Sequence, residues 1–143
     1  MTIREQILQA LMVRLAGNTP AGSAVYRSRT AALDEAQTPA IVVRPVEEAG
    51  IRLAPGMSQR ALVVEVRVMV SGDPPDGAAD PVAEAVHRLI YADPTIGGLA
   101  AALLGNDEAQ WEFDDGDRPY CELPLVYRLR YLATAGDLAQ PVI

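Results

Sequence analysis

Lysine is absent from this 143-residue sequence, and cysteine, histidine, phenylalanine and tryptophan occur once each. A single cysteine cannot form an intrachain disulfide, and a single histidine excludes a site built from several histidine ligands. All twelve basic residues are arginines, set against nineteen acidic residues, and the net charge is −7. Because nucleic-acid binding normally requires clustered basic residues, and none are clustered here, we expect no direct sequence-specific binding to DNA or RNA.

Long apolar runs are missing as well. None approaches the ~20 residues that a membrane-spanning helix requires, and Met1–Glu5 lacks the pattern of a signal peptide. Half of the residues are nevertheless apolar, which is sufficient for the core of one domain. We therefore expect a single soluble domain over residues 1–143, made in a reducing cytoplasm, with a loosely held tail from about residue 135 and no membrane partner.

Catalytic and metal-binding patterns are also absent. No glycine-rich phosphate loop occurs, and no Ser or Cys lies in a usual nucleophile motif. The acidic turn Asp114–Asp117 lacks the spacing of a calcium loop and has the Asp-Gly chemistry of a hairpin turn. His87 follows Glu84 by one turn on a polar helix face, where no catalytic role is needed to explain it. We expect no enzymatic activity, no metal and no cofactor, and a buried, inert thiol at Cys121.

Two long segments, Arg60–Ser71 and Cys121–Thr134, alternate between apolar and polar residues. A period of two predicts strands of a half-buried antiparallel sheet. The charged residues on the polar faces are Glu65, Arg67, Glu122, Arg128 and Arg130. We expect Glu65 and Arg67 to lie opposite Arg128 and Arg130. This charged face is either an ordinary solvated surface or a contact between subunits, in which mixed charges would set the register.

Two amphipathic helices are expected to cover the apolar face. Thr2 and Glu5 form a capping box at the start of the first helix, which should end at Gly17. Asp80-Pro81 should start the second helix, which should end near Ala92. Packing both helices on one side of a mostly antiparallel sheet gives an α+β fold, a two-layer sandwich, and leaves the charged face bare.

The remaining segments are less regular. Shorter strands are predicted at Ala24–Arg27, Ala40–Val46 and Glu108–Phe113, a stiff turn at Gly72–Gly77, and helical turns within Thr30–Thr38 and Leu99–Leu104. The edges of such short strands could extend the sheet between copies of the chain.

A long mobile loop is expected at Glu47–Gln59, which contains Gly50, Pro55 and Gly56 and shows no clear period. Either this loop is simply flexible, or its apolar side chains order against a partner. The candidates for an oligomer or partner interface come from this loop and the charged sheet face: Arg44, Ile51, Arg52, Leu53, Met57, Gln59, Glu65, Arg67, Glu122, Arg128 and Arg130.

The order of these segments is similar to that of a known family. The residues that carry the similarity are Ile3–Leu11, Val25–Arg29, Pro39–Pro45, Arg60–Val70, Gly72-Asp73, Asp80–His87, Trp111–Phe113 and Tyr127–Tyr131. Over nearly the whole chain this pattern resembles the tail terminator (tail completion, minor tail) proteins of long-tailed bacteriophages and prophages. Its motifs carry no catalytic signature.

The resemblance implies a two-layer subunit that assembles as a ring, commonly a hexamer, on the end of the tail tube. Such a ring stops polymerisation of the tube and provides the surface that joins the head. Its partners would be other copies of itself, the major tail tube protein and the head–tail connector protein, without a cofactor or enzymatic activity. Two alternatives stay open: another head–tail joining or minor tail protein, or a small cytoplasmic ligand-binding domain or enzyme. A closed pocket with His87, Glu84 and Tyr91 would favour the last.

Overall fold

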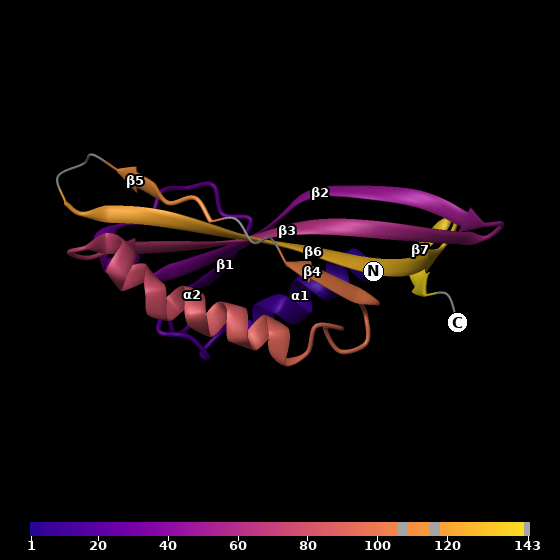
Figure 1. The fold of residues 1–143 in the computed structure, drawn as a ribbon, viewed down its shortest axis with the longest axis horizontal. Coiled ribbons are helices and arrows are strands. Elements are labelled where there is room, and N and C mark those ends of the chain that lie inside the picture. The colour runs from indigo at the N-terminus through magenta and orange to yellow at the C-terminus, as the bar shows by residue number, and fades with distance from the viewer. Residues whose placement is uncertain (106–108, 115–117, 142–143) are drawn as a thin grey trace.

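In the residues that the structure describes, a curled, mixed seven-stranded sheet with two α-helices forms the fold (Figure 1). The computed structural model describes residues 1–105, 109–114 and 118–141. Its elements are α1 (Ile3–Leu15), β1 (Val25–Arg27), a 3₁₀ turn (Glu35–Gln37), β2 (Ala40–Ala54), β3 (Met57–Ser71), α2 (Pro75–Ala92), β4 (Ala102–Gly105), β5 (Glu112–Asp114), β6 (Tyr120–Thr134) and β7 (Asp137–Pro141). The α+β class predicted from the sequence is confirmed.

The strands follow the order β1-β2-β3-β6-β4, and β5 and β7 also pair with β6. Only β1 and β2 are parallel among these pairs; the others are antiparallel. β3 and β6 pair along their full length, from Met57 opposite Thr134 to Ser71 opposite Tyr120. The two long strands predicted from their alternation are therefore the centre of the sheet.

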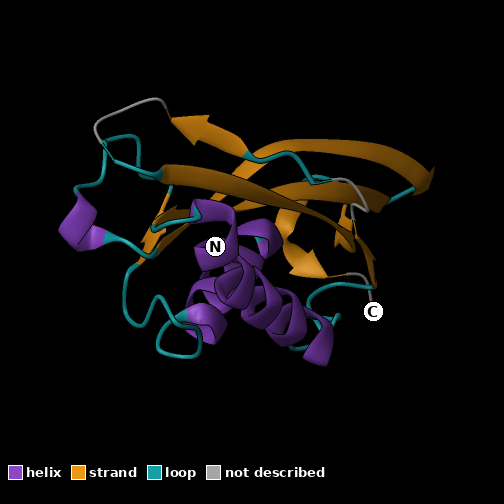
Figure 2. Ribbon diagram, turned by 60° about the vertical axis from the view of Figure 1, so that its left-hand side comes forward, coloured by secondary structure: helices purple, strands orange, loops and turns teal. Residues whose placement is uncertain are grey.

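The core lies between one face of the sheet and the helices. On β3 every second residue from Leu62 to Val70 is at most 1% exposed, as the alternation requires. Both helices lie on this side of the sheet (Figure 2) and contribute buried aliphatic side chains. Because the sheet is curled, with Leu138 of β7 packed against the core, the expected two-layer sandwich is not confirmed. No helix in the described residues is long and apolar enough to cross a membrane.

The start of α1 agrees with the sequence in part. The Thr2 hydroxyl accepts a hydrogen bond from the Glu5 amide at 3.2 Å, which satisfies one of the free N–H groups of the first turn. The Glu5 carboxylate does not complete the capping box, because Arg27 of β1 donates two hydrogen bonds of 2.9 Å to it. The helix ends at Leu15, and Gly17 has the positive φ expected after a helix.

The prediction that α2 starts at Asp80-Pro81 is wrong, and the stiff turn predicted at Gly72–Gly77 is wrong in part, because it extends only to Pro74. The helix begins five residues earlier, at Pro75, where a missing N–H costs nothing because first-turn amides have no partner within the helix. Ala79 is fully buried in the added turn, and this packing favours the earlier start. The predicted end at Ala92 is confirmed.

The mobile loop predicted at Glu47–Gln59 does not exist, and neither does the predicted end of the preceding strand at Val46. The segment is a continuation of β2 and β3, joined by a tight turn in which Gly56 has φ +80°. The ladder shifts by one residue between Pro45 and Glu47, and this β-bulge hides the period of two from the sequence. Gly50 lies opposite Arg60, whose guanidinium occupies the space that a Cβ atom would need.

Shorter segments give a mixed outcome. The strand predicted at Ala24–Arg27 and a helical turn within Thr30–Thr38 are confirmed as β1 and the 3₁₀ turn. The second helical turn, predicted at Leu99–Leu104, is wrong in part, because Ala102–Gly105 pairs with β6. The strand predicted at Glu108–Phe113 is observed as the shorter β5, and Glu108 lies outside the described residues.

The C-terminal tail also differs from the prediction of a loosely held segment. Asp137–Pro141 forms β7 and pairs with the end of β6. The tail is ordered by pairing with β6, and no pattern within the tail itself predicts this partner. Residues 115–117 of the predicted acidic turn lie outside the described residues, but β5 and β6 on either side pair antiparallel, as a hairpin requires.

Candidate functional site

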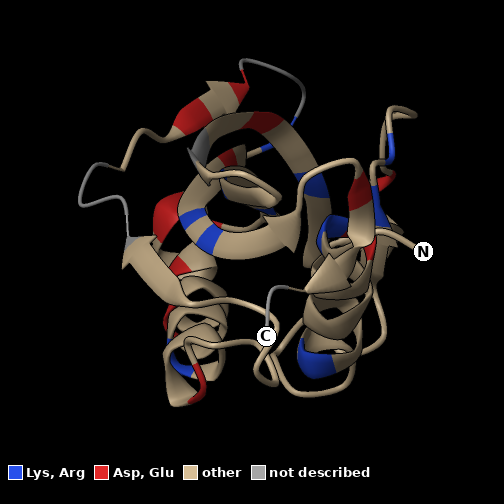
Figure 3. Cartoon of the chain, turned by 90° about the vertical axis from the view of Figure 1, so that its right-hand side faces the viewer, with Lys and Arg blue, Asp and Glu red and all other residues tan. Residues whose placement is uncertain are grey.

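The β-bulge in β2 divides its charged residues between the two faces of the sheet. Arg44 lies opposite Glu65, on the face away from the helices, which we call the outer face. Val46 is the extra residue, and Glu48 lies opposite the buried Leu62, on the face toward the helices, the inner face. Each face consequently carries its own network of carboxylate and guanidinium groups. Figure 3 marks the acidic and basic positions on the backbone, on the curled strands as well as on the helices.

The outer network is centred on Glu65, which is only 7% exposed. Arg44 Nε and Arg67 Nε donate hydrogen bonds to Glu65 Oε1 at 3.0 and 2.9 Å. Arg67 Nη1 also donates to Glu122 Oε1 at 2.9 Å and to the Glu112 carboxylate. Arg67 therefore ties together three strands, β3, β5 and β6.

These contacts change the proton affinities of the groups involved. Burial alone would raise the pKa of Glu65, but the hydrogen bonds from Arg67 and Arg44 outweigh it and hold the pKa below its ordinary value. Burial would lower the pKa of Arg67, and its three carboxylate partners raise it instead. Glu65 and Arg67 are thus charged at neutral pH and compensated within their own chain.

The predicted pairing of Glu65 and Arg67 with Arg128 and Arg130 is wrong. The register places Glu65 opposite Val126 and Arg67 opposite Pro124. It places Arg128 opposite Val63 and Arg130 opposite Ala61, two and four residues before Glu65 in β3. The ion-pair partners that the sequence does not predict are Arg44 for Glu65 and Glu112 for Arg67. These two residues come from β2 and β5, whose registers depend on the bulge in β2 and on the turn before β6.

The inner network is centred on Glu48 and was not predicted. Arg4 Nη1 of α1 and Arg60 Nε of β3 donate to Glu48 Oε2 at 2.8 and 2.9 Å, and the Tyr131 hydroxyl donates to Glu48 Oε1. Burial would raise the pKa of Glu48, but these three donors hold it below its ordinary value. Burial and the nearby Glu48 carboxylate raise the pKa of Tyr131. This network ties α1 to three strands of the sheet.

The other interface candidates differ in their exposure and contacts. Arg128 and Arg130 are exposed on the outer face and make no ion pair with another described residue. Ile51, also on the outer face, is 60% exposed. Met57 and Gln59 are half-buried, and Glu122 belongs to the outer network. The side chains of Arg52 and Leu53 lie outside the described part of the structure.

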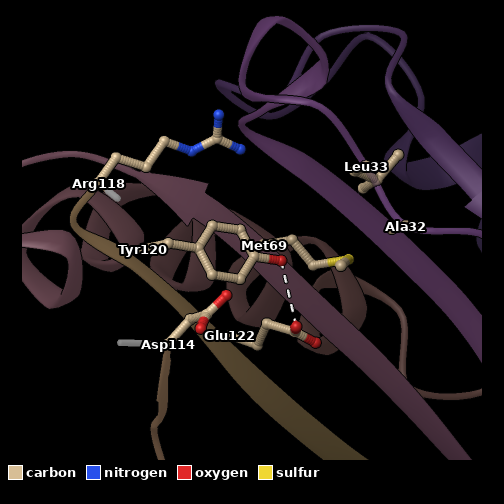
Figure 4. Close-up of a pocket in the computed structure, with 7 residues that line it drawn as sticks. All are labelled: Ala32, Leu33, Met69, Asp114, Arg118, Tyr120 and Glu122. Carbon is tan, nitrogen blue, oxygen red and sulfur yellow. Dashed lines mark hydrogen bonds between the residues drawn. The ribbon is translucent and has the colours of Figure 1, made fainter. Parts of the chain in front are cut away.

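Two adjoining hollows, of about 370 and 420 Å³, lie over one end of the outer face. Both are lined by Ala32, Met69 and Glu122, and Figure 4 shows the first of them. Tyr120 in that hollow donates a hydrogen bond of 3.1 Å to Glu122 Oε2. Burial and the neighbouring Glu122 raise the pKa of Tyr120, so it remains a neutral phenol. The arrangement offers polar contacts but no nucleophile paired with a base.

The only histidine, His87, has a structural explanation. Its Nδ1 atom lies 3.1 Å from the hydroxyl oxygen of Tyr127, which is 3% exposed beneath α2. Its ring lies 4.5 Å from that of Tyr91, centroid to centroid. Burial raises the pKa of Tyr127, and a polar partner for that buried hydroxyl stabilises the contact between α2 and β6. The described residues contain no cluster of three or more His, Cys, Asp or Glu that could hold a metal ion.

The prediction of a buried thiol at Cys121 is confirmed, since the residue is fully buried and burial raises its pKa. A protonated thiol in an apolar core is a poor nucleophile.

Comparisons with known proteins place the fold. No family model matches the chain, and no curated protein matches it. A solved structure shares the fold. It is a chain of a structure described as the virion of a native gene transfer agent particle, with a TM-score of 0.50 and 16% sequence identity over 90% of each chain. At that identity the likeness concerns the course of the backbone alone.

Proposed function

We propose that this chain is a structural protein of a virion or phage-like particle and has no enzymatic activity. The observation that carries the proposal is the fold shared with a chain of the gene transfer agent virion over 90% of both chains. A shared fold does not by itself assign a function. Here it agrees with a sequence pattern that resembles the same class of particle, and with the lack of a catalytic constellation in the described residues.

Within that class we propose the role of a tail terminator. The chain would assemble as a ring, commonly a hexamer, on the end of the tail tube and stop its polymerisation. It would then contact the major tail tube protein on one side and the head–tail connector protein on the other. It would be made in the cytoplasm of a bacterial host and end in the virion. We also propose that the subunit is a two-layer sandwich, in which the two helices form one layer over the sheet.

The geometry of the sheet suits a load-bearing subunit. β3 and β6 have 15 residues each and are about 50 Å long at ~3.3 Å per residue. The outer and inner networks tie neighbouring strands and α1 together on both faces. A net charge of −7 suits a passage for DNA, because a surface without basic clusters does not hold the phosphate backbone.

The interface candidates divide by exposure. Glu65 and Arg67 are compensated within the chain, so their main contribution is to hold the sheet together. Ile51, Arg128 and Arg130 are exposed and free to contact another protein. We therefore assign the contacts with partners chiefly to these three residues.

Deletion of the gene from the phage or prophage that encodes it tests this function. Electron microscopy of the resulting particles should show tails much longer than normal and unattached to heads, and a plasmid copy of the gene should restore normal tails. Normal-length tails without heads would instead identify another head–tail joining protein. Normal particles in normal number would refute a role in the virion.

A further inference from the structure

Half of β2 is a free sheet edge. β1 pairs with β2 only from Ile41 to Val43, and β3 occupies the other side of β2 along its whole length. From Glu47 to Ala54, β2 therefore has no neighbouring strand on its second side among the described residues. Unpaired N–H and C=O groups along such an edge can bind another strand.

A second free edge lies on the opposite side of the sheet, at the same position along the strands. β4 pairs with β6 and has no second strand neighbour in the part of the chain that the structure describes. The registers of the three ladders place Glu47, Val63, Arg128 and Leu104 in one row across four strands. The next row consists of Ala49, Ala61, Arg130 and Ala102.

The directions of the two edges are compatible. β2 runs antiparallel to β3, β3 to β6, and β6 to β4, so β4 is antiparallel to β2. A second copy moved sideways, without being turned over, would therefore bring its β2 beside β4 in antiparallel orientation. Because the two edges lie at the same height, this contact needs no shift along the strands.

The side chains at the two edges are complementary. Val46, Ile51 and Leu104 are large apolar residues that are 53%, 60% and 50% exposed at these edges, and pairing would cover apolar surface there. Glu47 is exposed on the outer face at the β2 edge and makes no ion pair with any described residue. Arg130 is likewise exposed on the outer face and makes no such ion pair, one strand in from the β4 edge. Ala102 is the neighbour of Arg130 on β4 and is small enough for the arginine to extend across it.

We propose that neighbouring copies of this chain join by continuing the sheet, with the β2 edge of one copy, from Glu47 to Ala54, paired to the β4 edge of the next. The proposal rests on the ring assembly proposed above and specifies its contact. Each copy uses two different edges, so the contact is head-to-tail and closes into a ring when the rotation completes a circle. Arg130 of each copy then lies two strand spacings across and two residues along from Glu47 of the next, ~12 Å away and within the joint reach of both side chains.

Disulfide trapping tests the contact directly. In a Cys121→Ser background, Ala49→Cys and Ala102→Cys are combined in one chain, and the purified protein is oxidised at a series of concentrations. We expect a ladder of covalent oligomers on a non-reducing gel that ends at one discrete ring size. The matched control combines Glu84→Cys with Arg88→Cys on the exposed side of α2. A ladder no stronger than that of the control would overturn the proposal.

Charge exchange gives a second test that tolerates a small shift in register. Glu47→Arg alone and Arg130→Glu alone should each lower the oligomer fraction at least tenfold, because like charges meet at every contact. An equimolar mixture should restore assembly, since alternating the two variants gives opposite charges at every contact. Glu84→Arg is the control for the charge change. Single variants that assemble normally, or a mixture that does not recover, would overturn the charged contact.

The two proposals can fail separately. Long tails after gene deletion, together with no ladder, would leave tail termination standing and refute the edge contact. A complete ladder together with normal particles after deletion would support the edge contact and refute the tail function.

Discussion

Arg44 and Glu48 lie on opposite faces of the sheet, although they are four residues apart in one strand. In a regular strand, residues separated by an even number share a face. The bulge at Val46 reverses the alternation, so Arg44 contacts Glu65 on the outer face and Glu48 contacts Arg4 on the inner face. One inserted residue thus determines which carboxylate serves which network.

Deletion of Val46 together with Glu47 should disrupt the fold. Removal of the extra residue alone leaves both halves of β2 in register with β3, but removal of one residue more moves either residues 48–54 or the first part of β2 to the opposite face, and in both cases a charged network loses its partner. We expect a loss in the free energy of unfolding of about 3 kcal/mol or more, because a nearly buried carboxylate becomes uncompensated. Urea denaturation measures the change. Val46→Ala is the control, with an expected change within about 0.5 kcal/mol since the side chain is exposed.

Glu48→Gln should destabilise the protein by about 1–3 kcal/mol, because the amide cannot accept charged hydrogen bonds from both Arg4 and Arg60. Tyr131→Phe removes one donor of the same network and should cost about 1 kcal/mol. A double-mutant cycle for these two residues, measured by chemical denaturation, should show coupling. Purely additive effects would mean that the hydrogen bond between them contributes nothing to stability.

Arg67 and Arg128 should behave differently when each is replaced by alanine. Arg67→Ala removes a donor shared by three carboxylates and should lower the free energy of unfolding by about 2 kcal/mol. Arg128→Ala, on an exposed side chain without an ion pair to the described residues, should change it by less than about 0.5 kcal/mol. Thermal melting of both variants decides the point. Equal destabilisation would contradict the separation of the two residues.

Stability should fall in acid. Glu48 and Glu65 have pKa values below their ordinary value in the folded state. A carboxylate whose pKa is lowered by folding stabilises the protein above the ordinary pKa, about 4.5, and this contribution disappears as the pH falls through the lowered value. Melting temperatures of the wild type should therefore decrease below about pH 4.5. The Glu48→Gln/Glu65→Gln double variant should show a shallower decrease, and an unchanged slope would show that other groups are responsible.

The central strands and their buried residues could be predicted because alternation in β3 and β6 is a local pattern that burial of one face enforces. The hairpin at Pro55-Gly56 could not, because the bulge at Val46 breaks the period and Gly50 resembles a loop residue. Gly50 makes room for Arg60, and this role depends on a residue of the neighbouring strand. The early start of α2 at Pro75 likewise depends on the burial of Ala79, which is a tertiary property.

The interface candidates show the same division. The sequence places Arg128 and Arg130 correctly on a polar face, but their row across the sheet depends on the register, which alternation alone leaves free. The sequence does not indicate a role for Glu48, because the segment around it has no clear period and resembles a loop. Its partners Arg4 and Tyr131 are 44 and 83 residues away in the chain, so the inner network exists only after folding.

Cryo-electron microscopy of the purified particle tests the central claim most directly, because it locates this chain in the virion. The account predicts one ring of copies at the head-proximal end of the tail tube, with β2 of each copy beside β4 of the next. A position in the capsid shell or at the distal tip of the tail, or absence from the particle, would contradict it.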